Sequence, residues 1–145
     1  MPLLTGRENA LLLGVLAGLS REEVRASLES IKRRSGLDAA FDRRVSTYSQ
    51  GMRARLGFAV IDHADPEVLL LDEVHEAIDE GFRRELEQRA SEIRRRGGIV
   101  IAAGHDHAEL RKLCDHAMVL GRSGIRPLDS FEDAEAEMAA LGARA

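Results

Sequence analysis

Two acidic side chains follow directly on a short apolar run near the middle of the chain. The run is Val-Leu-Leu-Leu at residues 68–71, and Asp72 and Glu73 come immediately after it. An aspartate in this position can hold Mg²⁺ through one oxygen or a bridging water, and an adjacent glutamate can orient and deprotonate an attacking water. The pair therefore indicates a place where a magnesium ion and a reacting water can be held together.

A histidine stands in the corresponding position after a second apolar run. The run Ile-Val-Ile-Ala-Ala-Gly covers residues 99–104, and His105 follows it. If both runs are parallel strands, their carboxyl ends meet at one edge of the sheet, where open α/β sheets gather their functional groups. His105 can there hydrogen-bond a phosphate or the attacking water. Each motif alone is also compatible with a structural role, and only their order favours a common site.

A third candidate is the turn Tyr-Ser-Gln-Gly-Met at residues 48–52, which opens a helical pattern. The first N–H groups of a helix have no partner in the helix, and the helix dipole adds partial positive charge there. Ser49 supplies a hydroxyl, and Gly51 permits close approach of the backbone, so a phosphate is a natural ligand. The structural alternative is that Ser49 only caps the helix, as most such serines do.

The elements that must position these residues form an α/β pattern. The apolar run at 67–73 predicts a strand buried on both faces of a parallel sheet, and 99–104 and 117–120 predict two further strands. Charged helical stretches near 78–96 and 106–113 lie between the strands, which predicts crossover helices. We expect a turn at 121–124 and a terminal helix within 129–145.

The first 35 residues predict two helices instead. Thr5 with Glu8, and Ser20 with Glu23, have the spacing of capping boxes, and Gly36 is a helix stop. We therefore expect three parts: a helical subdomain with the Ser49 helix at 1–64, a parallel-sheet part at 65–126, and a tail helix at 127–145.

The composition narrows the class of protein. A net charge of −4 gives no basic field for nucleic acid or an anionic membrane. The single Cys114 cannot form an internal disulfide, no apolar run approaches the roughly 20 residues of a membrane span, and the N-terminus lacks the pattern of a signal peptide. We expect a cytoplasmic protein, and docking on a membrane protein stays open.

These residues carry a resemblance. YSQGMRARLGFAV, DPEVLLLDEV, GIVIAAGHD and LCDHAMVL resemble, in order and spacing, the signature motif, Walker B strand, switch-histidine strand and following strand of ABC-type ATPases. The chain looks most similar to the ATPase subunits that export O-antigen, capsule and teichoic acid, and LTGRENALLLGVLAGLSREEV resembles the start of their helical subdomain. The resemblance extends from about residue 3 to 126 and implies part of a P-loop NTPase domain, whose sheet part is RecA-like.

The resemblance implies a role for each matching residue. The signature loop would comprise four residues, Ser49, Gln50, Gly51 and Met52. Asp72 would be the magnesium-side aspartate, Glu73 the general base, Asp79 the D-loop aspartate and His105 the switch histidine. In such ATPases two nucleotide-binding domains meet head to tail on a transmembrane permease, at the inner face of the membrane, and the signature loop closes over MgATP held by the other domain.

The sequence departs from the family at four points. Gln50 replaces the usual glycine or serine, Ile78 replaces a small D-loop residue, and Gly104 replaces the serine before the histidine. More importantly, no G-x-x-x-x-G-K-[ST] phosphate loop is present, since neither Lys32 nor Lys112 has that context. We therefore expect weak MgATP binding by this chain alone and uncovered apolar surface on its sheet.

Three functions remain open at this point. The first is a component of an ABC ATPase that powers polysaccharide or glycan export, truncated before the helical subdomain. The second is a non-catalytic interaction module that complements only a partner's ATP site. The third is a DNA-repair ATPase of the coiled-coil type, which the absence of a heptad arm and of a basic patch disfavours.

Overall fold

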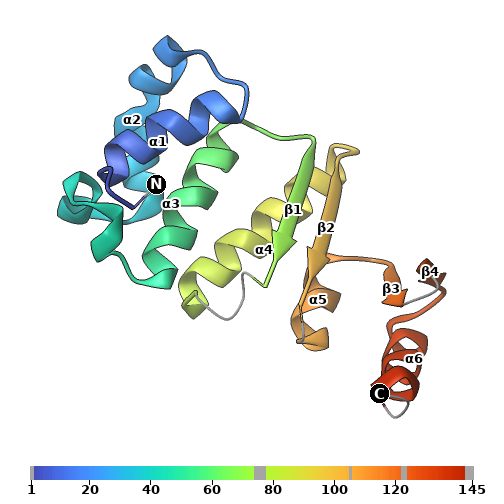
Figure 1. Ribbon diagram of the computed structural model, residues 1–145. Helices are drawn as coiled ribbons and strands as arrows, with labels where there is room; N and C mark the ends of the chain where they lie inside the picture. The colour runs from blue at the N-terminus through green and yellow to red at the C-terminus, as the bar shows by residue number, and fades with distance from the viewer. Residues whose placement is uncertain (1, 74–77, 105, 122–123, 143–145) are drawn as a thin grey trace.

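The computed structural model describes residues 2–73, 78–104, 106–121 and 124–142 (Figure 1). Its elements in chain order are α1 (Gly6–Leu16), α2 (Arg21–Ser35), the 3₁₀ turns η1 (Asp38–Asp42) and η2 (Val45–Thr47), α3 (Gln50–His63), β1 (Val68–Asp72), α4 (Glu80–Arg95), β2 (Ile99–Ala103), α5 (His107–Leu113), β3 (Ala117–Gly121), β4 (Gly124–Leu128) and α6 (Phe131–Gly142). Within these ranges no helix is both long and apolar enough to cross a lipid bilayer.

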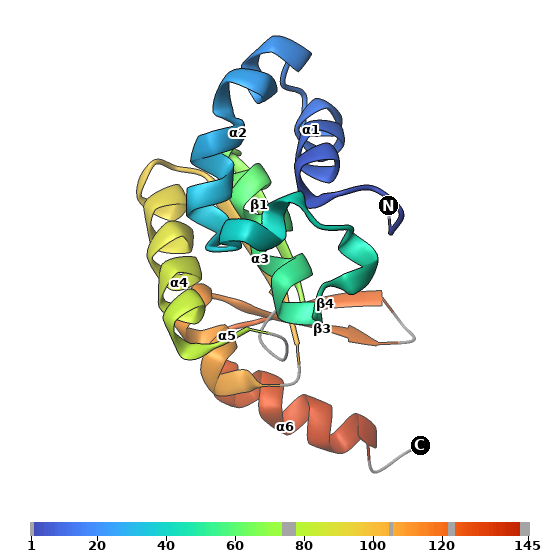
Figure 2. The same ribbon diagram turned by 90° about the vertical axis from the view of Figure 1, so that its left-hand side faces the viewer.

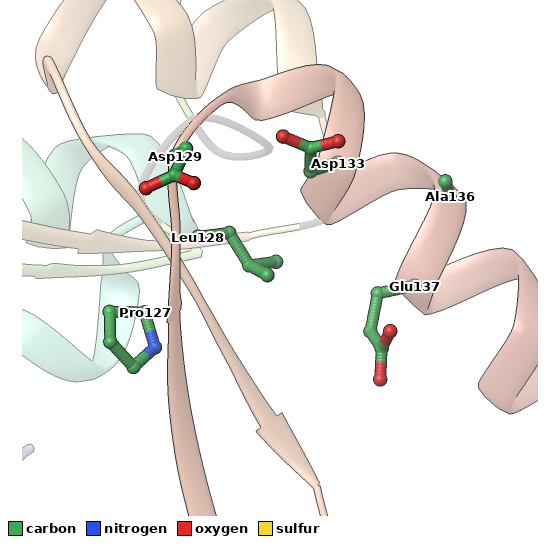
Figure 3. A pocket seen from close by; sticks show the side chains of 6 residues that line it. All are labelled: Pro127, Leu128, Asp129, Asp133, Ala136 and Glu137. Atoms are coloured by element: carbon green, nitrogen blue, oxygen red, sulfur yellow. The ribbon is translucent and has the colours of Figure 1, made fainter.

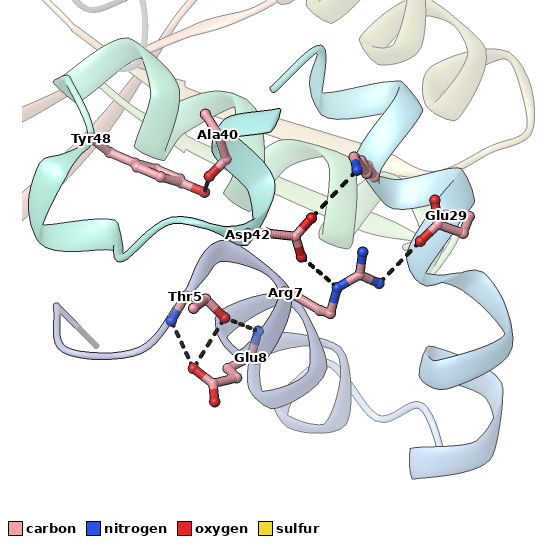
Figure 4. A network of polar contacts seen from close by, with 8 residues as sticks. Thr5, Arg7, Glu8, Glu29, Ala40, Asp42 and Tyr48 are labelled. Atoms are coloured by element: carbon pink, nitrogen blue, oxygen red, sulfur yellow. Dashed lines mark hydrogen bonds and ion pairs between the residues drawn. The ribbon is translucent and has the colours of Figure 1, made fainter. Parts of the chain in front are cut away.

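The first two helices begin and end where local sequence signals place them. At α1 the Thr5 hydroxyl accepts a hydrogen bond from the Glu8 N–H at 3.2 Å, and the Glu8 carboxylate accepts one from the Thr5 N–H at 2.8 Å (Figure 4). Ser20 and Glu23 repeat this capping box at α2, which Gly36 ends in the left-handed region at φ 61°. Both predicted capping boxes and the predicted helix stop are confirmed.

The three N-terminal helices enclose one apolar cluster, to which α1, α2, η1 and α3 all contribute. Arg7 on α1 ties the rim of this cluster together: it bonds Asp42 at 2.7 Å and Glu29 at 3.0 Å (Figure 4), and its guanidinium lies 5.2 Å from the centre of the Phe41 ring. Arg7 thus links α1 to α2 and to η1 at the edge of this cluster.

A second cluster lies under the sheet. β1 and β2 pair in parallel, with Leu70 opposite Ile101 and Asp72 opposite Ala103, and α4 and α5 pack against these strands (Figure 2). Phe58 of α3 joins this second cluster, although Leu56 and Val60 of the same helix belong to the first. Helix α3 thus connects the helical part to the sheet part.

The prediction that residues 67–73 are buried on both faces is wrong. Exposure alternates along β1, where the Leu69 side chain is 4% exposed and that of Leu70 is 69% exposed. Ile99 and Ile101 of β2 are also exposed. Helices cover one face of the two strands, and none of the described elements covers the other. The expected uncovered apolar surface is therefore present.

The prediction that residues 117–120 form a third parallel strand is also wrong, because the strand has a different partner. β3 lies at the expected position, but it forms an antiparallel pair with β4, from Ala117 opposite Leu128 to Gly121 opposite Gly124. No described strand pairs with the other edge of β2. β4 follows β3 after a short reversal, so the local partner satisfies the backbone of β3. We did not predict β4, because Arg126 and Pro127 interrupt its apolar pattern.

Leu70→Gln is expected to leave the free energy of unfolding nearly unchanged but to reduce self-association, because its side chain is exposed on the uncovered face. The measurement is light scattering at increasing protein concentration, together with thermal unfolding. Leu69→Gln is the matched control: it buries an amide without an assigned partner and should cost about 1–3 kcal/mol. Equal melting temperatures for the two variants would show that the assigned faces are wrong.

Candidate functional site

Ser49 is the N-cap of α3. Its hydroxyl oxygen accepts a hydrogen bond from the Met52 N–H at 3.1 Å, and the Ser49 and Gln50 side chains are exposed. The capping role considered as the structural alternative is therefore real. It does not preclude anion binding, because the hydroxyl still has a hydrogen to donate and the first N–H groups of the helix lack partners within it.

The turn before Ser49 is anchored to the helical cluster. The Tyr48 side chain is buried, its hydroxyl donates to the Ala40 carbonyl at 2.7 Å (Figure 4), and burial raises the pKa of this phenol. The Tyr48 carbonyl in turn accepts a hydrogen bond from Arg53 at 2.7 Å. Contacts on both sides of Tyr48 thus set the position of the Ser49 turn.

Gly6→Ala should disturb this anchor, because a Cβ at Gly6 would collide with the Tyr48 hydroxyl and lie 2.7 Å from the Phe41 carbonyl oxygen. We expect a loss of about 1–3 kcal/mol in the free energy of unfolding, measured by urea titration. Gly57→Ala is the control, since a Cβ there meets no atom within 4 Å and Gly57 lies inside helix α3. If both variants have the same stability, the close packing at Gly6 is refuted.

The carboxylates of the site lie at the end of β1. Asp72 is the last residue of the strand, and the Glu73 N–H donates to the Ala103 carbonyl of β2 at 3.0 Å. Glu73 has φ 48°, in the left-handed region, which costs a non-glycine residue about 1–3 kcal/mol. Such strain can mark functional sites, although Asp38 and Asp65 also have positive φ away from this site.

A groove of about 360 Å³ connects these carboxylates to the start of α3. Residues of α3 form one wall, and residues 69–73 form the other, so that Gln50, Asp72 and Glu73 line the same groove. This is possible because α3 and β1 follow each other in the chain and run in opposite directions, which brings the first turn of α3 to the carboxyl end of β1 (Figure 1). The fold thus joins two motifs that are more than twenty positions apart in sequence.

Asp79 has a structural role that its resemblance to the D-loop aspartate of ABC-type ATPases did not indicate. It caps α4 by accepting a hydrogen bond from the Phe82 N–H at 3.0 Å, and it pairs with Arg55 of α3. The Phe82 N–H and the Arg55 guanidinium hold the pKa of the Asp79 carboxyl below its usual range. The Arg55 guanidinium also lies 5.1 Å from the centre of the Phe82 ring.

The sequence did not identify Arg55 as a residue of this site. Arg55 joins the signature-like helix to the start of α4, but nothing local distinguishes it among the chain's many arginines. The cap itself was detectable, since Asp79 lies at the start of the helical stretch predicted near 78–96 and aspartate is a preferred N-cap. His105 lies outside the described residues, and after it Asp106 caps α5.

The described residues fit part of a magnesium–nucleotide site. They contain no group of three or more potential metal ligands. Mg²⁺ commonly uses only one or two carboxylates and takes its other ligands from water and substrate phosphates, so Asp72 suffices as a protein ligand. Ser49 and the first N–H groups of α3 fit a phosphate.

Comparison with known proteins finds relatives but no matching family model. The O-antigen export system ATP-binding protein RfbB of Klebsiella pneumoniae is 35% identical over 131 residues, which is 90% of this chain and 53% of RfbB. The teichoic acids export ATP-binding protein TagH of Lactococcus lactis is 30% identical over 85% of this chain and 26% of TagH. The chain thus spans about half the length of RfbB and about a quarter of TagH.

A solved structure shares the fold. It is a dimeric ATP-binding cassette in a post-hydrolysis state bound to ADP and Pi, and it superposes with a TM-score of 0.62 over 77% of this chain and 50% of its own. At 23% identity, this likeness shows the arrangement of helices and strands and nothing finer. The predicted α/β class and the order of a helical part before a sheet part are confirmed.

Proposed function

Because this chain is, over nearly all of its length, a relative of the ATP-binding proteins of O-antigen and teichoic acid export and has the α/β fold of part of an ABC-type ATPase (P-loop NTPase) domain, we propose that it is a component of such an ATPase. It would couple ATP hydrolysis to export of a polysaccharide or a related glycan. The observation that supports this most directly is the exposed N-terminus of α3 at Ser49 in a chain whose next strand ends in Asp72, followed by Glu73.

The proposed roles follow the chemistry of each group. The loop Ser49, Gln50, Gly51 and Met52 contacts the terminal phosphates of ATP held by a second domain, since it forms an exposed helix N-terminus. The Ser49 hydroxyl and the N–H groups of Gln50 and Gly51 make these contacts, while the Met52 N–H stays bonded to Ser49. Bound Mg²⁺ would supply charge neutralisation on these phosphates.

The residues at and after the strand ends would act on the metal and the water. At the ATP held by this chain's own domain, Asp72 would hold the metal, Glu73 would accept a proton from the attacking water, and His105 would position that water or the phosphate. For Asp79 we propose a contact across the dimer, beside its observed role as cap and partner of Arg55.

The phosphate-binding loop must then come from polypeptide outside these 145 residues. No lysine of this sequence has the context of such a loop. The uncovered apolar faces of β1 and β2 support a need for further protein there. We propose a head-to-tail arrangement with a second nucleotide-binding domain, docked on a transmembrane permease at the cytoplasmic face of the membrane.

Calorimetric titration of this chain with MgATP tests whether another polypeptide must supply the phosphate-binding loop. Weak or undetectable binding is expected, because the phosphate loop supplies much of the affinity of such sites. Adding a related nucleotide-binding domain that contains the loop should produce hydrolysis that neither polypeptide shows alone. Tight one-to-one binding by this chain alone would contradict the proposal.

A second candidate function is a non-catalytic interaction module, and the missing phosphate loop favours it. Such a module would still place Ser49 over ATP held by a complete partner, but Glu73 and His105 would do no chemistry. If coexpression with loop-containing partners yields stable complexes and never additional hydrolysis, this second function replaces the first.

A further inference from the structure

Helix α6 is attached to the molecule differently from the other long helices. Neither apolar cluster of the described residues contains a side chain beyond Cys114, and none of residues 131–140 is fully buried. By contrast, α4 buries Phe82, Leu86, Ala90 and Ile93. The attachment of α6 therefore lacks the apolar core that holds α4.

Apart from the small apolar side chains Ala117 and Val119 of β3, the attachment consists of charged contacts. Arg111 of α5 binds both Glu132 and Glu135 of α6, the latter at 3.0 Å, and its guanidinium lies 5.4 Å from the centre of the Phe131 ring. His107 Nδ1 also lies 3.5 Å from Glu135. At the other end, Arg126 of β4 pairs with Glu137 at 3.0 Å.

An open pocket lies between α6 and β4. A cavity of about 480 Å³ lies between Pro127, Leu128 and Asp129 on one side and Asp133, Ala136 and Glu137 on the other (Figure 3). It carries three carboxylates, but Asp133 already accepts from Ser130 and Glu137 already pairs with Arg126. We therefore interpret this cavity as incomplete packing and not as a ligand site.

These contacts differ in strength from core packing. Exposed ion pairs contribute about 0–1 kcal/mol each and weaken with salt, whereas each buried apolar side chain contributes about 1.5–3 kcal/mol. α6 should therefore detach at a much smaller free-energy cost than α4. α5 would stay in place without it, because its Leu113 is fully buried in the second cluster.

We propose that α6 is an electrostatic latch that opens from α5 and β3 while the elements from α1 to α5 remain folded. Arg111 is its main attachment point. Opening uncovers the inner face of β3, where Ala117 and Val119 are now buried and α6 is the helix in contact. It also uncovers the surface of α5, which begins two positions after His105.

Hydrogen exchange measured by mass spectrometry tests the latch. Arg111→Glu should raise the exchange rates of amides in α6 and β3 by about tenfold or more, with α4 unchanged. Raising salt from about 0.01 M to about 1 M should do the same in the native chain, because the Debye length falls from about 30 Å to about 3 Å. Arg84→Glu is the control, since the one acidic partner of Arg84 among the described residues is Glu80 on its own helix.

A charge exchange separates the latch from a general loss of stability. Arg111→Glu combined with Glu132→Arg and Glu135→Arg should restore slow exchange in α6. Failure of this rescue would overturn the proposal. So would native exchange rates in Arg111→Glu, or faster exchange that extends into α4, which would show that α6 and the core unfold together.

Discussion

Glu73→Gln is expected to reduce ATP hydrolysis by about 10²–10⁴-fold at the site it serves in the assembled ATPase, while assembly itself is preserved. Glutamine keeps the size of the side chain but cannot accept a proton from the attacking water. The backbone contact from the Glu73 N–H to the Ala103 carbonyl is retained, so the local structure should not change.

The measurement is steady-state phosphate release by this chain combined with the polypeptide that supplies the phosphate loop at the site of Glu73 and with a second nucleotide-binding domain. Glu67→Gln is the matched control: the same substitution just before the other end of β1, on an exposed residue that does not line the groove. Unchanged turnover in Glu73→Gln would remove Glu73 from the role of base. Equal loss in both variants would indicate an effect on the strand and not on the chemistry.

Phe82→Ala is expected to cause the largest loss of stability, about 3–5 kcal/mol in the free energy of unfolding. The Phe82 side chain is 1% exposed, its ring packs edge to face on Phe58 at 5.1 Å, and Arg55 lies over it. The variant removes the contact through which α3 meets α4 but leaves the Phe82 N–H bonded to Asp79. For a chain with a total stability of about 5–15 kcal/mol, this loss approaches the limit of folding.

Urea or thermal unfolding followed by circular dichroism measures this effect, with an expected fall in Tm of about 10 °C. Phe82→Leu should lose clearly less, because it retains most of the buried volume. Arg84→Ala on the exposed side of the same helix should be nearly neutral. A loss below about 1 kcal/mol in Phe82→Ala would show that α3 and α4 are not joined through this ring.

Sequence predicted the local structure well because its causes are local. The capping boxes at Thr5 and Ser20 and the stop at Gly36 depend on residues within one turn of each other. The strands at 68–72 and 99–103 were recognisable from their apolar runs, and the fold class followed from their alternation with helices.

The predictions from sequence were wrong or incomplete where the structure depends on residues that lie far apart in the chain. An apolar run does not reveal how many layers cover a strand, so the exposed face that includes Leu70 was not predicted from the run itself. Nor does it reveal which edge of a sheet finds a partner, so β3 was assigned to the wrong sheet. Arg55 was missed because its significance comes only from Asp79 and Phe82, which lie more than twenty positions later.

By itself, the sequence determined which groups are available for chemistry: the Ser49 turn, the Asp72 and Glu73 pair, and the lack of a phosphate loop. Only the tertiary structure decided that the turn and the pair share a groove, because α3 and β1 run in opposite directions beside each other. It also decided that Asp79 is occupied by Arg55 and that α6 is held by charges. These properties depend on which residues become neighbours in space. Packing decides this, and the order of the residues alone does not specify it.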